Sequence, residues 1–149
     1  MAATVTIFNK FKLGQINGDH FVAFGTDTFT VSLHTSAYTP DIDADEFYDD
    51  ITWTELPTAG NYTAGGQNLA GTSVGLDTGS DFVYFDATDL TWAGLTATFR
   101  YAVLRKNTGT AGTSPLIQFI DFGVDQEPAG VDFVMQWAAA AAGAILKAA

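Results

Sequence analysis

Cysteine is absent from the 149-residue sequence, and only six residues are Lys or Arg. Without cysteine the chain has no disulfides, thiolate nucleophiles or sulfur ligands for metals, so its stability must come from packing or from assembly. Against the six cations stand 17 Asp and Glu, which give a formal net charge of −11. Because this charge repels a phosphate backbone and the cations form no long basic run, we expect no nucleic-acid partner.

Long apolar runs are also missing. A membrane helix needs about 20 apolar residues, and the Ala-rich segment 137–149, which Gly143 interrupts, falls far short of that. Residues 1–10 lack the basic start and the apolar stretch of a secretory signal. We therefore expect no membrane partner and no export by that route.

Reactive side chains are few. The two histidines, His20 and His34, lie outside any HExxH or His-x-His pattern, and no Gly-x-Ser-x-Gly elbow positions a nucleophile. The pair Gly65-Gly66 lacks the Lys-Ser or Lys-Thr that follows in a phosphate-binding loop. We expect no catalytic residues and no cofactor, and we do not expect the chain to be an enzyme.

One acidic segment imitates a metal-binding loop. Residues 41–45 place Asp at alternate positions, as the start of a calcium loop does. The sixth position of that loop would be Glu46 instead of the required Gly, and the twelfth would be Thr52 instead of a bidentate Glu. We therefore expect a solvated acidic loop and no metal site.

The sequence does contain the material for a β-rich core. Hydrophobic residues make up 47% of the chain, which includes 12 Phe and 15 Gly. Aromatic side chains suit the pleated surface of a sheet, and glycine supplies the backbone conformations of tight turns. Because 149 residues suit one core, we predict a single mainly β domain over residues 1–149, built as an antiparallel β-sandwich or barrel.

Hydrophobic spacing and turn residues place the strands. The predicted strands cover residues 21–24, 27–35, 67–76, 82–85, 96–104, 116–122 and 131–137. The first two are expected to form a hairpin closed near Gly25. Residues 99–104 and 116–120 are almost continuously apolar, so we expect them to be central strands covered on both faces.

Two short helical segments are also predicted. Residues 7–11 suit a short N-terminal helix or turn that ends at Gly14. A single helical turn over residues 46–50 is expected to be N-capped by Asp43 or Asp45.

The C-terminal residues 138–149 allow two interpretations. They form either a final strand or turn packed on the same domain, or an arm that docks on a neighbouring subunit. In the second case Ile145 and Leu146 are its apolar contacts.

Aromatic residues concentrate in or beside the predicted loops. Exposed aromatic side chains of this kind anchor protein interfaces or stack on sugars, although they can equally pack over the edge of the core. With the two C-terminal residues they form a candidate partner interface of Tyr38, Phe47, Tyr48, Trp53, Tyr62, Ile145 and Leu146.

Several of these segments, taken in order, give the chain a family resemblance. It resembles small virion proteins of tailed bacteriophages, which include capsid decoration, or cement, proteins. The resemblance rests on residues 27–33, 35–40, 46–47, 61–66, 100–104, 115–117 and 120–123.

The resemblance implies an accessory protein that binds the outer surface of an assembled phage head and clamps neighbouring subunits. The implied partners are the major capsid protein and additional copies of the chain itself, as a homotrimer or another oligomer. Two alternatives remain open at this point. One is a structural protein of the phage tail or neck, and the other is a carbohydrate-binding module of a phage adhesin.

Overall fold

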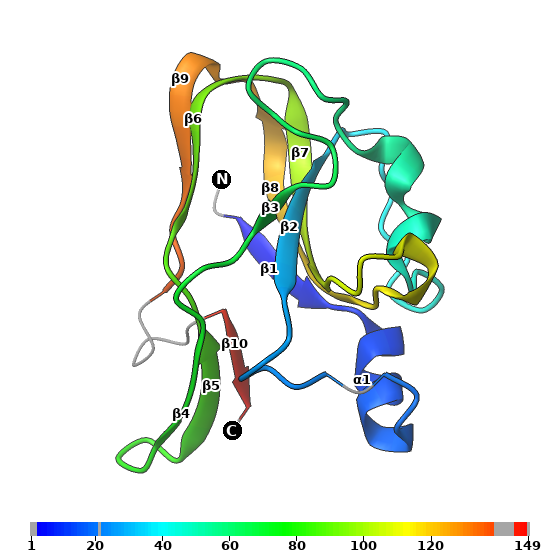
Figure 1. Cartoon of the computed structure of the whole chain (residues 1–149), viewed down its shortest axis with the longest axis vertical. Helices are drawn as coiled ribbons and strands as arrows, with labels where there is room; N and C mark the ends of the chain where they lie inside the picture. Colours follow the sequence, from blue (N-terminus) through cyan, green and yellow to red (C-terminus); the bar gives the residue numbers. More distant parts are fainter. Residues whose placement is uncertain (1–2, 21, 139–144, 149) are drawn as a thin grey trace.

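A five-stranded antiparallel sheet in the order β1-β8-β7-β2-β3 organises the computed structural model, which describes residues 3–20, 22–138 and 145–148. Its strands are β1 (Thr4–Ile7), β2 (Phe29–His34), β3 (Gln67–Asn68), β7 (Phe99–Lys106) and β8 (Leu116–Gln126). The predicted central strands 99–104 and 116–120 lie within β7 and β8, which pair over most of their length. This sheet is the frame on which the other elements pack (Figure 1).

Two smaller antiparallel sheets complete the β structure. Strands β6 (Leu90–Thr96) and β9 (Ala129–Met135) form one, and the order β10-β5-β4 forms the other, with β4 (Ser73–Asp77), β5 (Phe82–Asp86) and β10 (Leu146–Ala148). The fold is therefore mainly β and sandwich-like, and no sheet closes into a barrel among the described residues.

Aromatic contacts join the sheets on one face of the large sheet. Phe29 of β2 and Phe85 of β5 approach to a ring-centroid distance of 4.9 Å. Phe99 of β7 meets Phe133 of β9 at the same distance, with the rings nearly perpendicular. Edge-to-face pairs of this kind add stability beyond their buried area. This face is consequently the apolar core between the layers.

Both faces of β2 are buried, including its polar one. Phe29, Val31 and Leu33 point toward the apolar core, and the residues that alternate with them, which include Ser32 and His34, are also inaccessible to solvent. A long loop over residues 35–66 covers the polar face. It contains the short 3₁₀ helices η1 (Tyr48–Asp50) and η2 (Thr52–Thr54), and a third, η3 (Ala111–Thr113), follows β7.

The predicted N-terminal helix is present but longer than expected. Helix α1 covers Asn9–Asn17 and ends at Gly18, whose φ of 84° is left-handed, so the predicted end at Gly14 is wrong. Gly14 lies inside the helix, where a Cβ would approach His20 Cδ2 to 2.2 Å. The segment before the helix forms β1, since its backbone pairs with β8.

Other predicted boundaries also differ. The hairpin expected from residues 21–24 and 27–35 is wrong, because Ala23 accepts backbone hydrogen bonds from Thr26 and Asp27 in a turn. The predicted strand 67–76 divides into β3 and β4, with Gly71 in a left-handed conformation between them. Strand β6 was not predicted, and the predicted strand 96–104 starts at Phe99 as β7.

The C-terminal strand β10 lies in the sheet of the same molecule. Leu146 pairs with Phe85 and Ala148 with Val83. The Ala-rich segment of the predicted arm, residues 139–144, lies outside the described residues, so docking of an arm on a neighbouring subunit stays a prediction.

Gly66 should be intolerant of a side chain. Its φ is 81°, and a Cβ would lie 2.1 Å from the Val31 carbonyl oxygen of β2. We expect Gly66→Ala to lower the free energy of unfolding, measured by urea denaturation. The steric clash should add at least about 2 kcal/mol to the loss caused by the left-handed backbone conformation alone.

The matched control is Gly65→Ala. Gly65 also has a positive φ, of 101°, but a Cβ at this position would meet no atom within 4 Å, so only the strain of about 1–2 kcal/mol is expected. Equal losses in the two variants would contradict the close packing of this loop on β2.

Candidate partner interface

His34 attaches the 35–66 loop to the polar face of β2. Its Nδ1 lies 2.9 Å from Thr54 Oγ1, and its Nε2 lies 2.8 Å from Ser32 Oγ. Thr54 Oγ1 also donates to the Ile51 carbonyl at 2.9 Å, so it accepts from His34, and the proton of the neutral imidazole resides on Nδ1. Both ring nitrogens are thus occupied inside the protein.

The imidazole of His34 is kept neutral by its surroundings. Its side chain is fully buried, and burial, assisted by the nearby charge of Arg105, lowers its pKa to about 3. A serine hydroxyl and an imidazole at this distance resemble part of a hydrolase site. Because Ser32 is also fully buried, the pair serves to anchor the loop.

Glu55 is the second attachment point of the loop. Its Oε1 accepts a hydrogen bond from the Tyr62 hydroxyl at 2.6 Å and another from the Gly65 amide at 2.7 Å. Its Oε2 accepts from the hydroxyl of Tyr48. Burial and the neighbouring carboxylate raise the pKa of Tyr62 well above its usual range. Glu55 therefore joins three parts of the loop through charge-assisted bonds.

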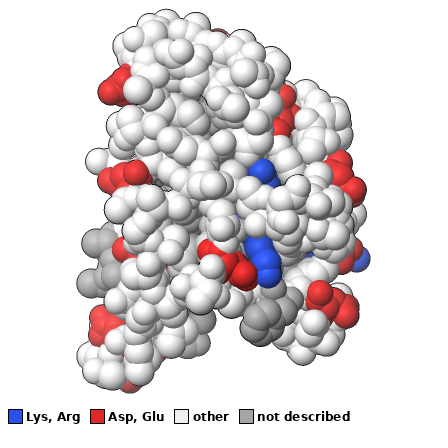
Figure 2. Space-filling view, viewed as in Figure 1, with Lys and Arg blue, Asp and Glu red and all other residues white. Residues whose placement is uncertain are grey.

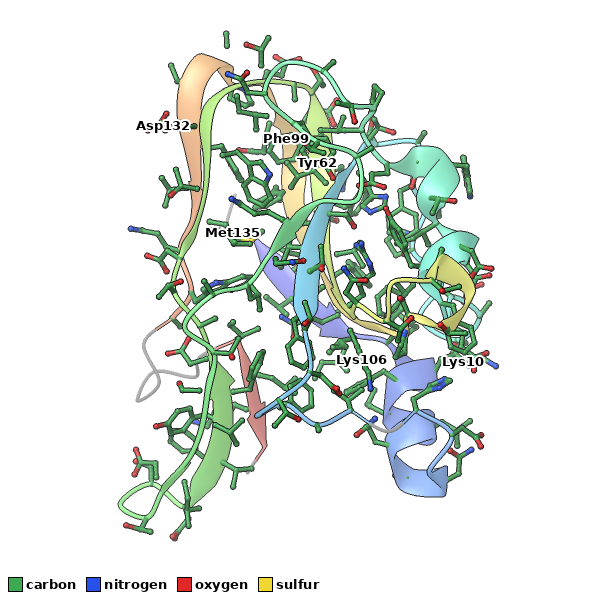
Figure 3. The ribbon with its side chains drawn as sticks, viewed as in Figure 1. Lys10, Tyr62, Phe99, Lys106, Asp132 and Met135 are labelled. Atoms are coloured by element: carbon green, nitrogen blue, oxygen red, sulfur yellow. The ribbon has the colours of Figure 1, made fainter. Side chains whose placement is uncertain are left out.

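Tyr62 connects this cluster to the sheet edge. Its hydroxyl accepts the amide hydrogen of Leu33 at 3.0 Å, beyond the point where β3 stops pairing with β2. The Leu33 carbonyl in turn accepts the Leu56 amide at 3.0 Å. The loop thus satisfies backbone groups of β2 that would otherwise be buried without partners. Figure 3 shows Tyr62 inside the body of the protein.

Arg105 of β7 lies beneath the same cluster. Its guanidinium carbon is 3.6 Å from the centre of the Tyr48 ring, and its Nη2 donates to the Gly65 carbonyl at 2.7 Å. Its Nε and Nη1 are buried and have no hydrogen-bond partner among the described residues. Burial lowers the pKa of Arg105, and the nearby Tyr48 and Glu55 oppose that effect. The guanidinium of Arg105 is therefore stabilised by the Tyr48 ring and by the negative charge of Glu55.

Trp53 projects from this braced loop into solvent. Its side chain is 73% exposed, and its Nε1 donates to the Asp50 carbonyl at 3.2 Å. The carboxylate of Asp50 accepts the amides of Glu46 and Phe47, each at 3.0 Å, so it is the acid that caps η1. The expected caps, Asp43 and Asp45, bond elsewhere.

The seven predicted interface residues occupy different environments. Trp53 alone among them is exposed, whereas Phe47, Tyr48 and Leu146 are partly buried. Tyr38, Tyr62 and Ile145 are in the core, at 3%, 1% and 6% exposure, and their side chains do not form surface of this molecule. The neighbouring sequence does not predict which of these aromatic side chains are buried, because all of them precede or follow polar residues in a similar pattern.

Sequence reasoning missed other exposed apolar side chains. Helix α1 presents Leu13 and Ile16, at 56% and 86% exposure. Strand β4 presents Val74 and Leu76, at 56% and 65% exposure. Both elements lie at the same end of the molecule (Figure 1). Their short and interrupted hydrophobic patterns did not reveal which face the fold leaves uncovered.

The carboxylates of the acidic segment 41–45 accept hydrogen bonds from within the protein. Asp41 Oδ1 accepts the amides of Asp43 and Ala44 at 3.0 and 3.1 Å, and Asp45 Oδ2 accepts the Tyr38 hydroxyl at 2.7 Å. Among the described residues no group of three or more His, Asp or Glu is arranged to hold a metal ion. None of the helices that the structure describes is long and apolar enough to cross a membrane.

Acidic and basic side chains are distributed differently on the face of the molecule drawn in Figure 2. Figure 2 shows acidic groups scattered over this face and basic groups confined to a few spots. Part of the basic charge is neutralised within the molecule, since Lys106 Nζ lies 2.9 Å from Asp27 and Arg100 pairs with Asp121 at 3.0 Å. Acidic groups are therefore in excess over basic groups on this face.

Comparison of the chain with known protein families, with curated proteins and with solved structures finds no significant match.

The buried His34 should make stability depend on pH. Its pKa is about 3 when folded and 6.5 when unfolded, so the unfolded chain binds the extra proton between these values, and stability falls as pH drops below 6.5. Between pH 6.5 and pH 5 we expect His34 to account for a loss of about 2 kcal/mol in the free energy of unfolding.

Urea denaturation at the two pH values measures this loss. In His34→Gln, which lacks the titrating group, the part of the pH dependence due to His34 should disappear even if the variant is less stable at both values. An unchanged difference between pH 6.5 and pH 5 would show that His34 is not held neutral by burial.

Proposed function

We propose that the protein is a structural virion protein of a tailed bacteriophage. Its proposed role is capsid decoration: it binds the outer surface of the head and stabilises contacts between major capsid subunits. This role requires a shaped surface and no catalysis. Its support is the resemblance of residues 27–137 to small phage virion proteins, together with a surface suited to binding another protein.

The observation that carries the proposal is the way Trp53 is presented. Among the described residues it is the only aromatic side chain that is exposed. The loop beneath it is fixed to β2 through His34 and Leu33 and to β7 through Arg105. The Trp53 indole is bonded to the Asp50 carbonyl. Tryptophan is frequent among residues that dominate binding energy, and a pre-ordered anchor loses little entropy on binding.

The surroundings of Trp53 define the partner surface. Asp49 and Asp50 beside it are exposed, and the chain carries a net charge of −11. A complementary partner would offer an apolar pocket for the indole with Lys or Arg at its rim. We assign that surface to the major capsid protein.

The energetic effect on the head follows from mass action. A protein that binds the assembled shell and not free subunits stabilises the shell by its binding free energy. Many copies on one particle add their contributions, so a modest affinity for each site is sufficient.

The isolation of Trp53 also weighs against the adhesin alternative. A sugar-binding groove stacks successive rings on several exposed aromatics, whereas the described surface offers one. A tail or neck protein could use the same anchor. Copy number separates these placements, because a decoration protein is present in hundreds of copies per particle and a neck or tail-tip protein in a handful.

Trp53→Ala should weaken binding to the shell without unfolding the protein. We expect the affinity for expanded heads that lack this protein, measured by cosedimentation, to fall at least about tenfold. Because the side chain is 73% exposed, the urea midpoint should barely change.

The matched control is Val131→Ala. Val131 is 56% exposed and belongs to β9, on the opposite side of the molecule from η1 and η2 (Figure 1). This variant should bind as the wild type does. Failure of the wild type to bind expanded heads, or to raise their disruption temperature, would overturn the proposed function, and equal binding by Trp53→Ala would remove Trp53 from the contact.

A further inference from the structure

Strand β4 has an open backbone edge. It is the outermost strand in the order β10-β5-β4 and pairs with β5 from Ser73 to Asp77 without a bulge. No hydrogen bond joins it to a second strand among the described residues. Natural edges are usually protected by Lys, Pro or a bulge, and none of these occurs in its sequence Ser-Val-Gly-Leu-Asp.

Apolar side chains follow this edge. Val74 and Leu76 are two residues apart and share one face of the sheet, and Val83 lies directly opposite Leu76. They are 56%, 65% and 47% exposed. The hairpin that carries them projects from the body of the protein (Figure 1), so a second chain can reach the edge without meeting the rest of the molecule.

The same face continues into an apolar hollow. The hollow has a volume of about 210 Å³ and is lined by Phe24, Val74, Val83, Tyr84, Phe85 and Leu146. Exposed apolar patches with an adjoining hollow mark sites of association more often than isolated exposed side chains do.

The sequence of β4 is complementary to itself. In an antiparallel pair of two β4 strands centred on Gly75, Val74 of one copy faces Leu76 of the other, and Ser73 faces Asp77. Both apolar side chains then lie on the same face, and no carboxylate of the strand faces another. Opposing like charges would destabilise a sheet pair, so the position of Asp77 permits this register despite the acidity of the chain.

Other sheet edges are less suited to this pairing. Strand β3 has two residues and β10 has three, with the charged Lys147 at the centre of β10. Strands β6 and β9 pair with two register irregularities, and such irregularities discourage further pairing. The β4 edge has five residues, more than β3, β10 or the four-residue edge strand β1, and unlike β6 and β9 it is regular. Its only charged residue lies at its end.

We propose that two copies of the chain associate through their β4 edges, with Gly75 on a two-fold axis, into a continuous six-stranded sheet. The occupant of the edge is thus a second copy of this chain. The dimer does not depend on the proposed role in the head. It would provide a decoration protein with two equivalent Trp53 loops related by a two-fold axis.

Charge substitutions at positions 74 and 76 test both the contact and its register. Sedimentation velocity over a wide concentration range should show the wild type passing from a 15.8 kDa monomer to a species of twice that mass. In the double variant Val74→Lys/Leu76→Lys each lysine faces a lysine of the other copy. We expect its dissociation constant to rise at least about tenfold.

The decisive comparison is Val74→Lys/Leu76→Glu. In the proposed register its lysine faces a glutamate of the other copy, so dimer formation should be restored in this variant. Likewise, Val74→Lys/Leu76→Lys mixed with Val74→Glu/Leu76→Glu should form a mixed dimer, although each alone should associate more weakly than the wild type. Val131→Lys/Val134→Lys, which places the same charges on exposed valines of β9, should associate as the wild type does.

Three outcomes would overturn the proposal: a wild type that stays monomeric at all concentrations, a trimer, or equal weakening in the Lys/Lys and Lys/Glu variants. Circular dichroism of each variant verifies that the hairpin substitutions leave the fold intact. Binding of expanded heads is measured separately, so a head-binding monomer contradicts the dimer alone, and a dimer that ignores heads contradicts the proposed function alone.

Discussion

The hydrogen bonds to the carboxylate of Glu55 hold the loop that carries Trp53. The carboxylate accepts hydrogen bonds from the hydroxyls of Tyr48 and Tyr62 and from the amide of Gly65. It also interacts with the nearby charge of Arg105. This partly buried carboxylate satisfies three donors at once. Removing the carboxylate would leave the Tyr62 hydroxyl and the Gly65 amide without this hydrogen-bond acceptor, so Glu55 holds the loop as a unit.

Fixing the loop in this way has a consequence for binding. A surface loop of about 30 residues would ordinarily be mobile, and ordering it on contact with a partner would reduce affinity. Here the ordering is completed on folding, because the loop satisfies the edge of β2 and covers its polar face. The polar side chains of the loop face inward and bond within the protein, whereas Trp53 and the apolar side chains of β4 are exposed.

The frame of the fold could be predicted from the sequence more readily than its surface. Strands β2, β7 and β8 were predictable because they are alternating or continuously apolar, which is a local property. Strand β6 was not, since its alternation is interrupted by Gly94 and a bulge. His34 and Tyr62 are held in the interior by hydrogen-bond partners that lie 20 and 29 positions away in the sequence. No local pattern can report such contacts, so the division of the aromatics into anchors and exposed residues required the structure.

Hydrogen exchange under native conditions tests most directly whether the loop is a fixed part of the folded body. The Leu33 amide reports on Tyr62, and the Gly65 amide reports on Glu55. Both are predicted to exchange nearly as slowly as the amide of Val103 in the central strand β7, because they are released only when the domain unfolds. Rapid exchange of Leu33 and Gly65 with Val103 still protected would show a loop that opens on its own, and would contradict a Trp53 loop that is rigid in the folded protein.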